Sequence, residues 1–167
     1  MIEKVKRMKV KKVVIHTSCD TYGSAAEYAR HGFNYQNWIN NVQRILKELP
    51  NVYIDIMVTY NVFSVTRFLD FLIDIKRINR KRYFLFDRIK LSISYVRDPE
   101  VLTAWILPFS YTAHIIVQLD YMKNNKFSPT EINQLERILE LCRSEINNID
   151  NLRSRFYMFV QEHDRRR

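Results

Sequence analysis

Two clusters of polar side chains follow apolar runs in the first part of the chain, and their residue types suit the binding of a charged ligand. Residues 17–21 follow a β-branched run and include Ser18 and Asp20. A second apolar run begins at residue 52 and ends in a polar turn that contains Asn61. Ligands of parallel βα folds bind outside the carboxyl ends of the strands, where loops carry the chemistry. The sequence therefore predicts a binding site formed by these two clusters.

Alternating strand and helix patterns place the two clusters at one edge of a sheet. Strands are predicted at residues 10–17, 52–59 and 89–95, and apolar residues at helical spacing predict helices at 34–49 and 64–78. Helices of this length between successive strands favour parallel pairing with right-handed crossovers. We therefore predict an α/β fold, a partial βα barrel with parallel strands.

The C-terminal part of the chain has a helical pattern. One helix is predicted to begin at Ser128 with a capping-box pattern that ends at Glu131, and to run toward residue 149. Further helical patterns precede and follow it. The chain contains no linker long enough to divide domains, so we predict a single half-barrel-like domain over residues 1–167. Its βα units occupy residues 10–98 and its C-terminal helices residues 101–167.

The chain is basic, with 27 Lys and Arg residues against 18 Asp and Glu residues and a net charge of +9. Its basic residues cluster in the runs 4–12, 76–90 and 165–167. Such runs are either solvated faces and connector loops or a contact with a polyanion such as RNA or DNA. Charge alone does not separate these interpretations, and both stay open here.

Several common site classes lack their motifs. The two cysteines, Cys19 and Cys142, lie too far apart for a CxxC pattern, and His16 has no second ligand at metal spacing. The two glycines exclude the glycine-rich phosphate loops, and Ser18 lacks the glycines of a nucleophile elbow. No apolar stretch approaches the length of a membrane span. A reducing, cytoplasmic location without membrane contact is therefore expected.

The order and spacing of the strand-end residues give a family resemblance. One strand ends with Ser18 and Asp20, and Arg30 follows about ten residues later. A long helix then leads to a strand that ends with Thr59 and Asn61. This order resembles the middle of a radical S-adenosylmethionine barrel of the SPASM or twitch type. The resemblance covers nearly the whole chain.

The later part of the sequence is similar to a phage- or virus-associated branch of this family. It contains Arg97-Asp98-Pro99, then Ile106-Leu107-Pro108, and it closes in residues 159–167. Members of the family carry a CxxxCxxC loop whose thiolates hold a [4Fe–4S] cluster, and this sequence has no such loop. The resemblance therefore implies the C-terminal half of a barrel, either as a fragment of a longer product or with its cluster-bearing half encoded separately.

The resemblance also implies roles for the strand-end residues. Arg30 would pair with the cofactor carboxylate, because a planar guanidinium matches both of its oxygens. Ser18 would bind the carboxylate or the ribose, and Asp20 the ribose. Asn61 would face the adenosyl group. Each role has a structural alternative: an exposed helix-end arginine, a turn cap, an ordered loop and a left-handed turn, respectively.

Two residues after the third strand are candidates for substrate contact. Tyr95 and Arg97 would lie on the same rim as the cofactor residues, although packing or a surface ion pair explains them equally well. Cys19 follows Ser18 directly, so its side chain should point to the opposite face of the strand. We expect it to be a buried structural thiol rather than a ligand.

Three functions remain open from the sequence. The first is part of a radical enzyme that binds S-adenosylmethionine, with a [4Fe–4S] cluster only if an N-terminal half is present; alone, this chain should not catalyse radical formation. The second is a non-catalytic α/β module that binds nucleic acid through its basic runs. The third is a half-barrel whose open edges require the N-terminal half or a second copy.

Overall fold

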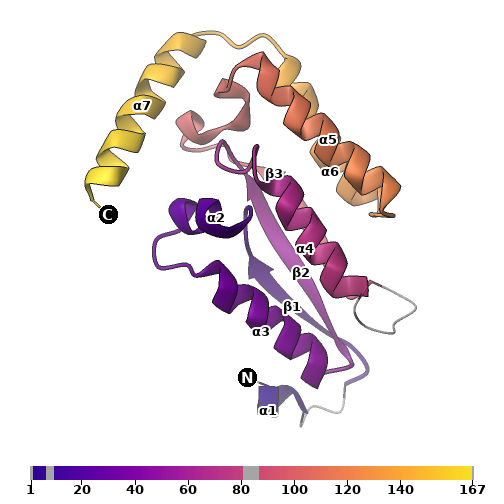
Figure 1. Ribbon diagram of the computed structural model, residues 1–167. Coiled ribbons are helices and arrows are strands. Elements are labelled where there is room, and N and C mark those ends of the chain that lie inside the picture. The colour runs from indigo at the N-terminus through magenta and orange to yellow at the C-terminus, as the bar shows by residue number, and fades with distance from the viewer. Residues whose placement is uncertain (1, 7–9, 81–86, 167) are drawn as a thin grey trace.

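The protein is built on a three-stranded parallel sheet. The computed structural model describes residues 2–6, 10–80 and 87–166. The strands are β1 (Val13–Ser18), β2 (Val52–Tyr60) and β3 (Ile89–Tyr95), in the spatial order β1-β2-β3, and both neighbouring pairs are parallel (Figure 1). The predicted α/β class and the predicted parallel pairing are confirmed. Consecutive strands lie side by side, as a partial βα arrangement requires.

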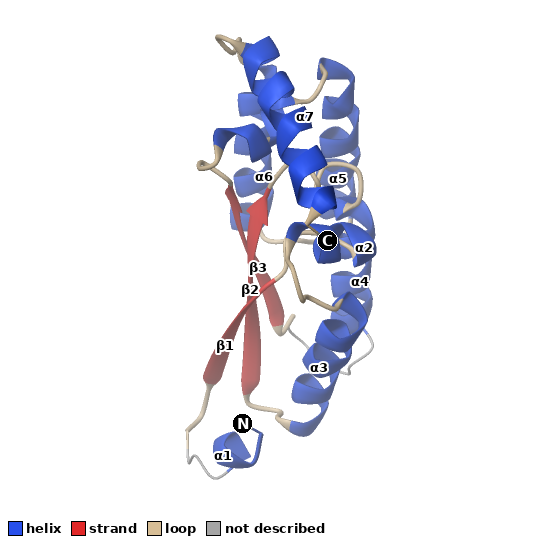
Figure 2. Ribbon diagram, turned by 90° about the vertical axis from the view of Figure 1, so that its left-hand side faces the viewer, coloured by secondary structure: helices blue, strands red, loops and turns tan. Residues whose placement is uncertain are grey.

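Helices cover one face of this sheet. They are α1 (Ile2–Lys6), α2 (Gly23–Ala29), α3 (Tyr35–Glu48) and α4 (Phe68–Arg80). The long helices α3 and α4 lie on the same side, whereas no described helix covers the opposite face along β1 (Figure 2). Burial alternates accordingly along β2, where Val52, Ile54 and Ile56 are buried and Met57 is 46% exposed. The sheet therefore has a covered apolar face and an open face.

Helix α3, between β1 and β2, begins and ends close to the predicted residues. Asn34 caps α3 by accepting a hydrogen bond from the Asn37 backbone, and the helix ends before Pro50. Arg88 is 5% exposed and donates to the backbone carbonyls of Leu46, Leu49 and Val52. It thereby satisfies the last carbonyls of α3 from the start of β3.

The C-terminal part contains three short 3₁₀ segments and three helices. The 3₁₀ segments are Glu100–Leu102, Ala104–Ile106 and Phe109–Tyr111. They lead into α5 (Thr112–Asn124), α6 (Pro129–Arg143) and α7 (Ile149–Arg165). Ser128 and Glu131 form the predicted capping box of α6. Within the described ranges, no helix combines the length and apolar character needed to cross a membrane.

Some predicted boundaries were wrong. The first strand begins at Val13 rather than at residue 10, and it is half-buried rather than fully buried because only one of its faces is covered. The helix predicted over residues 128–149 ends at Arg143, and a new helix begins after Asn148, whose φ of 64° breaks the helical path. The fourth helix begins at Phe68, because Ser64 lies in the turn that precedes it.

Candidate functional site

A cleft of about 310 Å³ opens where the parallel strands end. This volume is at the lower limit of clefts that hold small organic ligands, which measure about 300–1,000 Å³. Its polar lining residues are Asp20, Arg30, Thr59, Asn61 and Asp98. Its ring-bearing lining residues are Tyr28, Phe63, Phe159 and His163, and Ala29, Val96, Pro99 and Leu102 complete the lining. Asp20, Arg30 and Asn61 were predicted as site residues, and the fold brings all three together.

Asp20 organises the polar side of the cleft. Its two carboxylate oxygens accept hydrogen bonds from Arg30 Nε at 2.8 Å and Arg30 Nη2 at 3.0 Å, and one of them also accepts from the Thr59 backbone N–H at 2.9 Å. Asp20 is only 5% exposed. A buried carboxylate requires such charged and hydrogen-bonded partners. Asp20 therefore joins the end of β1, the end of β2 and the residue that follows α2.

Arg30 keeps part of its binding capacity after pairing with Asp20. A guanidinium has five N–H donors, and Asp20 uses one from Nε and one from Nη2. The edge formed by Nη1 and the second Nη2 hydrogen stays available, and the side chain is 38% exposed. The hydrogen bond to Asp20 raises the pKa of Arg30, so the group stays charged. Arg30 can therefore present two further donors to an anion.

Asn61 shapes the loop after β2. Its side-chain carbonyl accepts from the Phe63 backbone, and its amide donates to the Thr59 carbonyl. The Asn61 backbone N–H donates to Ser64 Oγ, which in turn donates to the Asp20 carbonyl. Asn61 thus closes an Asx turn, and its φ is not positive as a left-handed turn would require. The turn locks the loop to the strand end that carries Asp20.

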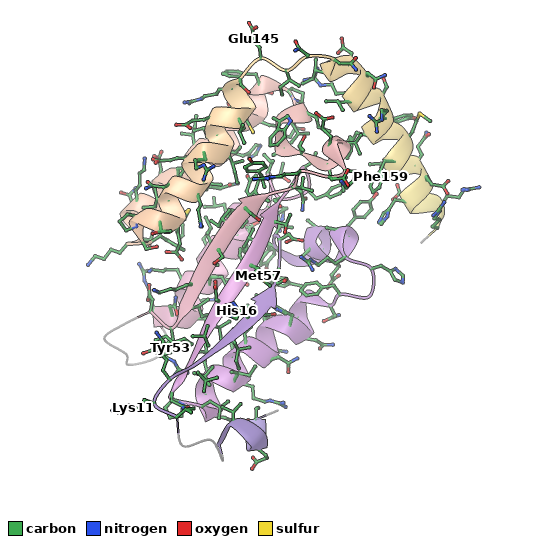
Figure 3. The ribbon with its side chains drawn as sticks, turned by 180° about the vertical axis from the view of Figure 1, so that it is seen from behind. Lys11, His16, Tyr53, Met57, Glu145 and Phe159 are labelled. Carbon is green, nitrogen blue, oxygen red and sulfur yellow. The ribbon has the colours of Figure 1, made fainter. Side chains whose placement is uncertain are left out.

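The aromatic side of the cleft joins residues that are distant in the sequence. His163 Nε2 lies 3.1 Å from the Tyr28 carbonyl, and the Tyr28 hydroxyl donates to Asp164 at 2.7 Å. The rings of Tyr28 and His163 meet edge to face at 4.7 Å, and those of Phe159 and His163 stack at 5.9 Å. Helix α7 therefore closes the cleft from the side opposite β1, and Figure 3 labels Phe159 on it.

The other predicted site residues do not line the cleft. Ser18 is paired in register with Met57 in the sheet, on the face that the helices leave uncovered. Tyr95 packs against Trp105 at 5.5 Å, and Arg97 lies over the Tyr95 ring at 5.4 Å. Tyr95 follows Ile93 on the covered side of β3, which directs it away from the cleft. The structure therefore favours the packing alternative for Tyr95 and Arg97.

The thiol nearest the cleft has the features of a structural group. Cys19 is fully buried and donates to the Thr21 carbonyl at 3.2 Å. Burial raises the pKa of Cys19 to about 12, so the thiolate form needed for metal binding is suppressed. Among the residues that the structure describes, no group of three His, Cys, Asp or Glu side chains is placed to hold a metal ion. These residues therefore do not fit an iron–sulfur cluster.

Sequence patterns did not predict Tyr28, Asp98, Phe159 or His163 as site residues. Asp98 belongs to a motif that supports only the resemblance, and it lines the cleft from the loop after β3. Phe159 and His163 lie on the last helix, where their spacing of four indicates only a shared helix face. Their position at the cleft depends on tertiary packing.

Much of the middle basic run is engaged inside the molecule. Lys76 is 6% exposed and contacts Asp87, and Arg77 pairs with Asp74. At the C-terminus, Arg165 and Arg166 both pair with Glu162, which lowers the pKa of that carboxyl. Residues 81–86 and 167 of the predicted nucleic-acid contact lie outside the described residues. Several basic side chains of the middle and C-terminal runs therefore make local ion pairs.

Comparisons of this chain with protein-family models, with curated proteins and with solved structures found no match.

Proposed function

We propose that this chain is the S-adenosylmethionine-binding part of a radical S-adenosylmethionine barrel and that the cleft at the strand ends holds the cofactor. The observation that carries the proposal is the mixed lining of the cleft, which contains aromatic rings and a guanidinium that, among the described residues, pairs with Asp20 through only two of its five N–H groups. S-adenosylmethionine has matching ends, a charged amino-acid group and an adenine ring. The strand-end resemblance supports the same ligand.

The residues of the cleft have defined tasks in this function. Asp20 fixes Arg30 so that its Nη1 and Nη2 donors receive the cofactor carboxylate as a charge-assisted pair. Asp98 offers carboxylate oxygens to the α-amino group or to a ribose hydroxyl. Phe159 and Phe63 offer ring faces for the adenine, because stacking on aromatic side chains suits any base. These groups bind and orient the cofactor.

Reductive cleavage of the cofactor is not a task of the described residues. Their cysteines and carboxylates do not fit a cluster, so no electron-transfer step follows from them. A polypeptide that carries a CxxxCxxC loop would supply that chemistry. The function proposed for this chain alone is therefore cofactor binding.

Calorimetric titration with S-adenosylmethionine tests this proposal. Wild-type protein should bind, and Arg30→Ala should weaken binding at least about tenfold, since a charge-assisted pair contributes about 1.5–3 kcal/mol. Arg97→Ala is the matched control, because Arg97 lies on Tyr95 outside the cleft. Phe159→Leu should also weaken binding while leaving the Asp20 pair intact. Wild-type protein that produces no binding heat, or equal affinities for Arg30→Ala and Arg97→Ala, would overturn the proposal.

Nucleic-acid binding through the basic runs stays a second prediction, next to cofactor binding. A phosphate-driven contact loses affinity steeply as salt rises, whereas a cofactor cleft responds much less. Titration of a short single-stranded RNA at two salt concentrations separates the two functions. Tight, salt-sensitive RNA binding without binding of S-adenosylmethionine would favour the basic binding module.

A further inference from the structure

The two edges of the sheet differ in how their backbone groups are satisfied. Along β3, the outward N–H groups are capped by side chains: Ile89 donates to Asn79 Oδ1 at 3.1 Å, Leu91 to Glu131 Oε1 at 2.8 Å, and Ile93 to Gln134 Oε1 at 2.8 Å. Helix α6 supplies two of these acceptors. The sheet is therefore closed to strand addition at β3.

The edge at β1 is open. The Val13 N–H donates to the carbonyl of Asn51, the residue before β2, and the Cys19 N–H donates to the carbonyl of Met57 in β2. Because N–H groups alternate between the two edges of a strand, those of Val14, His16 and Ser18 point outward. Within the parts of the chain that the structure describes, no side chain or backbone carbonyl accepts from these three groups. They form a regular row of free donors and acceptors.

Edges that are protected from pairing carry a proline, a bulge, charged side chains or a covering element. Among the residues that the structure describes, this edge carries no proline and no helix lies over it, and on its open face His16 contacts Asp55 at 3.3 Å. β1 has the sequence VVIHTS without proline, and Val14 is 45% exposed beside it. On the same face, Met57 is 46% exposed, and Figure 3 shows His16, Tyr53 and Met57 on the face turned toward the viewer. The exposed apolar side chains of the open face thus lie next to the free hydrogen-bonding groups of the β1 edge.

We infer that the free edge of β1 pairs antiparallel with β1 of a second copy of this chain. The three outward residues are centred on His16, so a twofold axis through His16 sets His16 against His16 and Val14 against Ser18. In this register every outward N–H group of one copy faces a carbonyl of the other. Among the described strands, β1 is also the one that presents a complementary free edge. The pairing would produce a continuous six-stranded sheet.

This dimer does not use the proposed cofactor cleft, but it occupies the β1 edge at which an N-terminal barrel half would pair. The cleft lies beyond the carboxyl end of β2 and is lined from α2, α7 and the loop after β3, so its lining residues do not include the outward residues of β1. Loss of dimerisation would leave the cofactor titration unchanged, and loss of cofactor binding would leave the oligomeric state unchanged.

Analytical ultracentrifugation of the full chain, from about 1 to about 100 µM, is the first test, because strand pairing alone is expected to give roughly micromolar affinity. Wild-type protein should shift from monomer to dimer. His16→Pro removes one outward N–H without removing a hydrogen bond within the sheet, so this variant should stay monomeric. His16→Ala keeps the N–H and should still dimerise. Circular dichroism checks that both variants are folded.

A second pair of variants tests the dimer without proline, because His16→Pro could unfold the strand. His16→Lys places two like charges next to each other at the twofold axis and should weaken dimerisation at least about tenfold. Met57→Lys adds the same charge to the same face on β2, away from the axis, and should not. A wild-type monomer at the highest concentration, or a dimer that persists in both His16→Pro and His16→Lys, would overturn the inference.

Disulfide trapping tests the register. In a hydrogen-bonded antiparallel pair, facing Cα atoms lie about 5.5 Å apart, within the range that a disulfide bridges. In a Cys142→Ser background, His16→Cys should form a crosslinked dimer on mild oxidation. Lys90→Cys, on the same face of β3, should not. A crosslink at residue 90, with none at residue 16, would place the contact elsewhere.

Discussion

Asp20 holds the cleft together at the scale of a single residue. It contacts Arg30 through two hydrogen bonds and Thr59 through a third, at 5% exposure. Removing its charge leaves a guanidinium with a weakened partner and a backbone donor with a poorer acceptor. The same carboxylate that shapes the binding surface therefore also stabilises the fold.

Asp20→Asn should lower the free energy of unfolding by about 2–4 kcal/mol, below the largest values for fully buried pairs because Arg30 is 38% exposed. Urea denaturation measures this loss. Asp70→Asn is the matched control, since Asp70 pairs with Arg67 at the surface and should cost less than about 1 kcal/mol. Similar losses in the two variants would show that the buried pair contributes no more than a surface pair.

Glu131 joins two elements with one carboxylate. One oxygen accepts from the Ser128 backbone at 2.7 Å and from the Ser128 hydroxyl, which completes the cap of α6, and the other accepts from Leu91 at the edge of β3. Glu131 is 7% exposed. A local capping signal in the sequence thus also docks α6 against the sheet.

Ser128→Ala removes only the cap and should cost about 1 kcal/mol of stability. Glu131→Ala removes the reciprocal half of the capping box and also leaves the Leu91 N–H without its acceptor, so its cost should reach about 2–4 kcal/mol. Chemical denaturation of both variants compares the two costs. Equal costs would contradict a role of Glu131 beyond capping.

At the scale of the whole molecule, the two edges of the sheet differ: a further strand can pair at β1 but not at β3. At β3 the backbone is satisfied internally by α4 and α6, whereas at β1 it is exposed. A parallel sheet with one uncovered face and one free edge is a structure that partner surface normally completes. The free β1 edge suits the second copy inferred above, whereas the capped β3 edge would have to open for the sheet to close into a barrel.

Amide hydrogen exchange should reveal this asymmetry in dilute protein. The amides of Leu91 and Ile93 should be protected although β3 is an edge strand, and those of His16 and Ser18 should exchange at least about tenfold faster. Nuclear magnetic resonance at low and high protein concentration measures both sets. Protection of the β1 amides that does not depend on concentration would mean that the edge is covered within one molecule.

Much of the fold follows from local sequence patterns. The periodicity of residues 34–49 predicted α3 within one residue at each end, and the alternation of residues 89–95 predicted β3 with its observed bounds. The capping box at Ser128 was also predicted. The break after Arg143 was missed because apolar spacing continues through it, and α2 was missed because seven residues carry little periodic signal.

The candidate site was predictable only in part. Strand-end position predicted Asp20 and Asn61, because parallel pairing gathers all carboxyl ends at one edge, whereas Arg30 was predicted only from the family resemblance. Tyr95 and Arg97 were expected at the same rim, but side-chain alternation turns Tyr95 toward Trp105. The contribution of α7 had no signal in the sequence, since more than a hundred residues separate Tyr28 from His163.

The sequence by itself predicted the three strands and most of the longer helices, the parallel pairing of the strands, and the collection of polar groups at their carboxyl ends. Those properties depend on periodicity, capping and short connections, which are local. Only the tertiary structure decided that Arg30 is held by Asp20, that rings from the last helix line the same cleft, and that one edge of the sheet is capped while the other is free. These features depend on contacts between residues distant in the chain, and a local pattern does not encode which of many compatible partners will meet.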